Sequence, residues 1–173
     1  TKNSEKERRK LEPLFEAVER GETIAAHNSN FERVIWEKVC MSKLAWPVKP
    51  KGRQWDCTAA RAAAISIPRS LEGAALALRL KVAKDPLGKG LIHKFSKPQK
   101  DGSRIRSTDD PQAFGKFVEY CEQDTVVECE LDHVLPHLSD YERKVFQLDY
   151  KINDTGIPVD IAAINRALVF IDE

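Results

Sequence analysis

Helical spacing of apolar residues dominates this sequence, and only two short segments have the pattern of a β-strand. The predicted strands are residues 23–27 and 54–58. Helices are predicted over residues 2–20, 31–41, 59–65, 71–80, 112–135 and 139–153, and again after Asp160. Two short strands cannot cover so many amphipathic helices. The sequence therefore predicts an α/β fold that is predominantly helical and lacks much of its sheet.

Composition excludes several classes of protein. The 173 residues suffice for one domain, or for one domain and part of a second, and the net charge of +1 indicates no particular partner. No apolar run is long enough to cross a bilayer, and the charged first ten residues do not resemble a secretory signal. The four cysteines form no CxxC pair, which favours reduced thiols in a cytoplasmic protein without a membrane partner.

Glu32 is the first candidate for chemistry, because it stands in the first turn of a predicted helix directly after a strand. An acid at that place has two interpretations. It can stabilise the N-terminus of the helix through the helix dipole. Alternatively, it can face the crevice at the carboxyl ends of the strands, where α/β proteins bind ligands.

Tyr120 and Asp124 are the second candidate, because a spacing of four places them on one face of a predicted helix. Apolar residues flank this face, where a carboxylate needs an ion or a partner. The alternative is a partly exposed acid beside a core tyrosine. Phosphodiester hydrolysis by two metal ions would use several carboxylates, with a phenol beside the attacking water, and oxygen ligands suit Mg²⁺ or Mn²⁺.

Three motifs, in this order, resemble one family. The segment HNSNFE (27–32) is similar to the second motif of the DEDD 3′–5′ exonucleases, and YCEQD (120–124) is similar to the third motif in its YxxxD form. The segment YERKVFQLDYKINDTGIPVD (141–160) resembles the joint between the exonuclease and polymerase regions of family A, phage-type DNA polymerases. The resemblance implies a proofreading exonuclease domain over residues 1–138 and the start of a polymerase region over residues 139–173.

The resemblance also implies roles for single residues. Asp124 and Glu32 would hold Mg²⁺ or Mn²⁺, Tyr120 would orient the attacking water, and Asn28 and Phe31 would line the cleft near the 3′-terminal nucleotide. The implied partners are a single-stranded or frayed DNA 3′ end and the rest of a polymerase chain in a bacterial or phage-infected cell. The implied fold is ribonuclease H-like.

One motif of the family is absent, because no strand with Asp-x-Glu precedes the first helix. We therefore expect a chain truncated at its N-terminus, with an incomplete two-metal site and little or no hydrolysis. Two alternatives stay open: an RNA-trimming enzyme similar to ribonuclease D, and a non-catalytic module that holds DNA or braces a polymerase.

Two further segments carry weaker signals. Residues 84–111 have little periodicity and many basic side chains, which predicts a long basic loop that could contact phosphates. His133 and His137 have the spacing of a helical zinc pair, but Pro136 lies between them and no third ligand follows. Asp56 is interpreted as a cap or turn residue.

Overall fold

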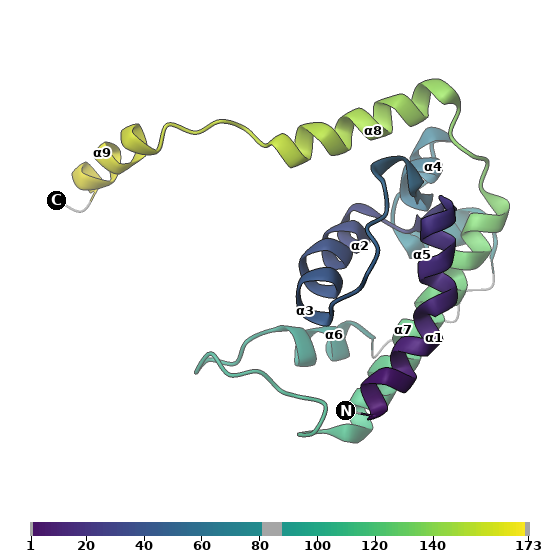
Figure 1. Ribbon diagram of the computed structural model, residues 1–173. Helices are drawn as coiled ribbons and strands as arrows, with labels where there is room; N and C mark the ends of the chain where they lie inside the picture. Colours follow the sequence, from purple (N-terminus) through teal and green to yellow (C-terminus); the bar gives the residue numbers. More distant parts are fainter. Residues whose placement is uncertain (1, 81–87, 172–173) are drawn as a thin grey trace. The chain divides into compact units, whose positions relative to one another are not determined.

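The computed structural model describes residues 2–80 and 88–171, and Figure 1 traces the chain. The chain divides into two compact units, residues 1–138 and 139–173. The predicted order of helix, strand, helix and strand, followed by helices, is confirmed. The first unit contains α1 (Lys2–Arg20), β1 (Ile24–Ala26), α2 (Asn30–Ile35), the π-helix η1 (Trp36–Met41), α3 (Ser42–Leu44), the 3₁₀ turn η2 (Gly52–Gln54), β2 (Trp55–Cys57), α4 (Thr58–Ala64), α5 (Leu71–Ala77), α6 (Gly88–Ser96) and α7 (Pro111–Val134).

The two strands form a parallel pair in which Ile24 lies opposite Trp55 and Ala26 lies opposite Cys57. Parallel strands need a crossover, and here α2, η1 and α3 supply it. Both strands therefore end at the same edge. The chain leaves β1 through Asn28, which has a φ of 68°, a left-handed conformation that asparagine tolerates better than most residues. It leaves β2 directly into α4.

Aromatic rings fill the core beside the sheet. Trp36 contacts Trp46 and Trp55 edge to face, with ring centroids 4.7 and 6.1 Å apart, and Phe15 of α1 contacts Trp46 at 5.3 Å. The indole nitrogen of Trp36 donates a hydrogen bond to the Val48 carbonyl at 2.9 Å, so its one polar atom is satisfied. These contacts join α1, the crossover helices and β2.

Small side chains allow three helices to approach closely in a second cluster. Ala62 of α4, Ala74 of α5 and Leu131 of α7 are fully buried together, with Leu135 just beyond α7. The cluster fixes the C-terminal half of α7 against α4 and α5.

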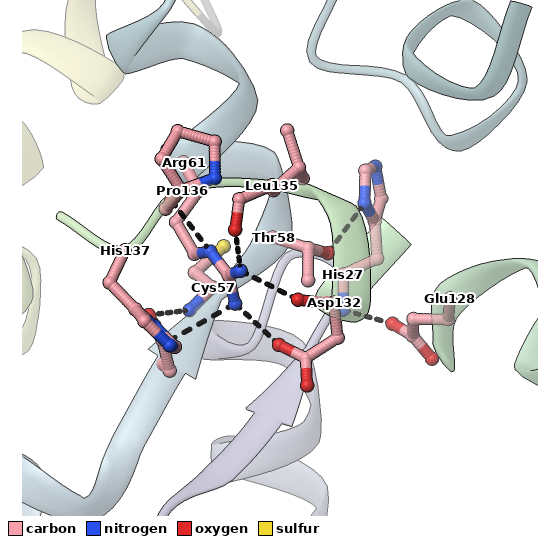
Figure 2. A network of polar contacts seen from close by, with 10 residues as sticks. His27, Cys57, Thr58, Arg61, Glu128, Asp132, Leu135, Pro136 and His137 are labelled. Carbon is pink, nitrogen blue, oxygen red and sulfur yellow. Dashed lines mark hydrogen bonds and ion pairs between the residues drawn. The ribbon is translucent and has the colours of Figure 1, made fainter. Parts of the chain in front are cut away.

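A buried arginine joins β2 and α4 to the end of α7. The guanidinium of Arg61 is fully buried and lies 3.4 Å from the carboxylate of Asp56, and it also pairs with Asp132 of α7 (Figure 2). Asp56 is only 2% exposed and lies within β2, so its interpretation as a cap or turn residue is wrong. It is instead the buried counter-charge of Arg61.

The predicted loop over residues 84–111 is partly wrong, because it contains α6; residues 84–87 lie outside the described residues. Two glycines in the first turn of α6 conceal its helical spacing. Packing stabilises the helix, because Phe95 stacks on Phe117 at 5.6 Å and meets Phe114 edge to face at 5.3 Å, both on α7.

The second unit consists of α8 (Asp140–Thr155) and α9 (Ile161–Ile171). Ser139 and Glu142 form a capping box at the start of α8, where each side chain bonds the other residue's backbone N–H. The segment NDTGIPVD (153–160) has the pattern of a turn and a short strand, but the structure forms no strand over these residues. The helix continues to Thr155 and ends at Gly156, whose φ is 69°.

Candidate functional site at the carboxyl ends of the strands

The site begins where β1 ends. The ring of His27 bridges the two strand ends. Its Nδ1 lies 2.9 Å from the Thr58 hydroxyl (Figure 2), and its Nε2 lies 2.8 Å from the Arg69 carbonyl. A carbonyl can only accept, so Nε2 carries the proton. Thr58 is fully buried at the start of α4. His27 therefore fixes the path of the chain into α2.

Glu32 lies in the first turn of α2, and its environment is not that of a simple helix cap. One carboxylate oxygen, Oε2, is buried and has no hydrogen-bond partner among the described residues. Burial raises the pKa of Glu32 above its ordinary value, and the negative charge of Glu128 raises it further. A backbone hydrogen bond opposes these effects in part. An acid held in this way suits a site that receives a cation.

Glu128 of α7 also belongs to the candidate site at the end of β1, and it was not predicted from the sequence. One of its oxygens accepts a hydrogen bond from the backbone N–H of His27, at the end of β1 (Figure 2). Glu128 follows Asp124 by four residues, so both lie on the same face of α7, about 6 Å apart along its axis. Extending the four-residue spacing of Tyr120 and Asp124 by one more step would have found it.

The other predicted residues lie on these same elements. Asp124 is partly buried on α7, one turn before Glu128, and its charge adds to burial in raising the pKa of the Cys121 thiol. Asn28 is exposed in the turn after β1, and Phe31 is 61% exposed in the first turn of α2. The structure thus brings Glu32 to α7 through Glu128, with Asp124 in the adjacent turn.

Tyr120 packs against the first residue of α6. A Cβ atom built on Gly88 would lie 2.3 Å from Cε2 of the Tyr120 ring, which is far inside van der Waals contact. The ring can therefore rest on the backbone of α6 only because residue 88 is glycine. This contact positions the phenol that the sequence predicts to serve the site.

Gly88→Ala is expected to destabilise the first unit by about 1–3 kcal/mol, because α6 and the Tyr120 ring must separate. Gly90→Ala is the matched control: it lies in the same helix with nothing within 4 Å of its added Cβ. It is expected to stabilise the chain by up to about 1 kcal/mol through helix propensity. Urea unfolding followed by tryptophan fluorescence measures both, and equal effects would contradict the contact.

The raised pKa of Glu32 predicts a pH-dependent stability. The folded chain binds this proton more tightly than the unfolded chain, whose value is 4.5, so stability falls as pH rises from there through the folded pKa. Glu32→Gln is therefore expected to raise Tm at neutral pH and to have no effect below the unfolded value. Glu130→Gln, an exposed acid on α7, is the control. A gain of equal size at both pH values would contradict the assignment.

Metal-ligating residues do not form a complete centre within the part of the chain that the structure describes. Among residues 2–80 and 88–171, no group of three or more His, Cys, Asp or Glu is arranged to hold an ion. The zinc pair considered for His133 and His137 has no third ligand there. Instead, Nδ1 of His137 lies 3.6 Å from the carboxylate of Asp56, beside the buried arginine (Figure 2).

Comparison with known proteins identifies a relative. The chain is 36% identical over 151 residues to the DNA polymerase of Bacillus phage SP02. The chain is similar to part of a phage DNA polymerase. The alignment covers 83% of the chain and 22% of that polymerase. The predicted relationship to phage polymerases is thus confirmed at this level, and the exonuclease assignment remains a prediction. No family profile and no solved structure matches the chain.

None of the helices in the described part of the chain is both long and apolar enough to span a bilayer.

Proposed function

We propose that this chain is part of the 3′–5′ proofreading exonuclease domain of a DNA polymerase, with a ribonuclease H-like fold. One observation carries the proposal: Glu32 has a buried oxygen without a partner among the described residues, and it lies near Glu128, on the face of α7 that also bears Asp124. The motif pattern and the polymerase relative support the same assignment.

Each predicted residue would have a distinct role in hydrolysis. Asp124 and Glu32 would hold Mg²⁺ or Mn²⁺, which suit oxygen ligands, and a bound cation would relieve the unfavourable burial of Glu32. When bound, divalent ions would activate water and neutralise charge on the leaving oxygen. Tyr120, held against Gly88, would orient the attacking water toward the terminal phosphodiester. Two carboxylates are too few for two ions, so the longer polymerase chain would supply the others.

The test is mononucleotide release from 3′-labelled single-stranded DNA by a polymerase that contains this chain. We expect release with Mg²⁺ or Mn²⁺ and none with a chelator. Faster release from RNA of the same sequence would favour the alternative enzyme similar to ribonuclease D. No release from either substrate, with polymerisation intact, would favour a non-catalytic module, in line with the incomplete set of acids in the described residues.

A further inference from the structure

Positive charge is concentrated in one part of the chain. Residues 88–116 contain seven Lys or Arg and three Asp, whereas the whole chain has a net charge of only +1. The remainder of the chain is therefore net negative. A local excess of this kind is the electrostatic feature by which proteins attract nucleic-acid phosphates.

The acids in this segment are already engaged locally. Asp110 caps α7 through the Ala113 N–H at 3.0 Å and pairs with Lys94 of α6. Asp101 bonds Ser103 within a turn at 2.7 Å. The carboxylate of Asp109 accepts a hydrogen bond from the backbone N–H of Arg106 at 2.7 Å.

Five exposed cations in this segment make no ion pair with any residue that the structure describes. We call them the basic surface: Lys97, Lys100, Arg104, Arg106 and Lys116. Arg104 donates to the Ser96 carbonyl at 2.7 Å, which folds the loop back on α6 without neutralising the charge. Several cations in one segment, without an acid partner among the described residues, favour an anionic partner.

The loop that carries these cations is ordered by its own hydrogen bonds. The Gln99 N–H donates to the Ser103 carbonyl at 2.8 Å, and the Gly102 N–H donates back to the Gln99 carbonyl at 2.9 Å. The phenylalanines of α6 and α7 pack on one another, so they are not free to stack on bases. A partner would therefore be held through its phosphates, without dependence on sequence.

The basic surface lies beside the candidate site. The segment begins at Gly88, against Tyr120, and α6 packs alongside the N-terminal half of α7 (Figure 1). From Asp110 to Tyr120, α7 rises by about 15 Å. A strand whose 3′ end lies near Tyr120 could extend over this distance along the cations.

We propose that the basic surface binds the phosphates of single-stranded DNA whose 3′ end enters the candidate site at the end of β1 and on α7. The choice of DNA rests on the proposed exonuclease function. The surface itself rests on the charges and contacts of residues 88–116.

Replacing Lys97, Lys100, Arg104 and Arg106 together by Gln tests this binding in the 173-residue chain. Fluorescence anisotropy of labelled oligothymidylate, measured between about 50 and 200 mM salt, gives the affinity and its salt dependence. Four lost phosphate contacts should reduce the slope of log K against log salt by about 3. We expect the affinity at the lower salt concentration to fall at least about tenfold. Circular dichroism checks that the variant is folded.

The matched control replaces four exposed cations elsewhere by Gln: Lys38, Lys43, Arg53 and Lys144. It changes the net charge equally and should leave most of the affinity and slope in place. Equal losses in both variants, or no binding by the unmodified chain, would overturn the proposal. If the chain instead binds the rest of the polymerase through these cations, and DNA does not compete, the surface is a protein interface and the proposal fails.

This experiment needs neither cleavage nor metal, so it is independent of the exonuclease test. Lost binding in the first variant, together with a polymerase that releases no mononucleotides, would keep the DNA surface and reject the catalytic function. Unchanged binding by that variant, together with a polymerase that does release mononucleotides, would reject the DNA surface and keep the catalytic function.

Discussion

Asp124→Ala is expected to abolish most 3′-terminal release by a polymerase that contains this chain, while polymerisation continues. A carboxylate that holds a catalytic cation supplies several kcal/mol of stabilisation to the transition state, so the rate should fall about 1,000-fold. The measurement is release of labelled mononucleotides from single-stranded DNA at saturating Mg²⁺ or Mn²⁺. Asp124→Asn keeps the shape of the side chain and should lose activity similarly, which separates charge from packing.

Glu122→Ala is the control, because Glu122 is an exposed acid on the same helix. It should leave release within about twofold, as surface changes do. Full activity in the Asp124 variants would show that the candidate site is wrong. Full activity there together with loss in a Glu128→Gln variant would move the essential carboxylate one turn along α7.

Most helices of this chain could be predicted because they have an apolar face of regular spacing. The face of α1 that buries Phe15 and Val18 is an example, and its predicted bounds are those observed. α6 could not be predicted in this way. Its glycines lower helix propensity, and its stability comes from Phe114 and Phe117, some twenty residues away in the sequence.

The candidate site shows the same limit. The approach of Glu32 to α7 depends on a hydrogen bond between His27 and Glu128, which are 101 residues apart in the sequence. The spacing of Tyr120 and Asp124 indicates the correct helix face but not which turn meets β1. Glu128 makes that contact. Arg61 was likewise missed, because an arginine among alanines has the pattern of a solvent-exposed helical position. Its burial depends on acceptors at the end of α7.

Arg61→Met is expected to destabilise the first unit by about 3–5 kcal/mol, the usual cost of removing one partner from a buried ion pair. The guanidinium donates to the carbonyls of Asp132 at 2.7 Å and Pro136 at 3.1 Å, and also to the Leu135 carbonyl. Its loss would leave the buried carbonyl of Leu135 without this donor and the buried carboxylate of Asp56 without its counter-charge. Arg61→Lys should recover little, because one ammonium cannot reproduce the planar fork.

Tryptophan fluorescence in a urea titration reports this change locally, since all three tryptophans lie in the first unit. Arg53→Met, at an exposed position, is the control and should shift the unfolding free energy by less than about 0.5 kcal/mol. Combining Arg61→Met with Asp56→Leu also removes the buried carboxylate that would lack its counter-charge. The double variant should therefore be more stable than Arg61→Met alone. If the two losses simply add, the carboxylate of Asp56 does not depend on Arg61, and the α7 carbonyls alone account for the effect.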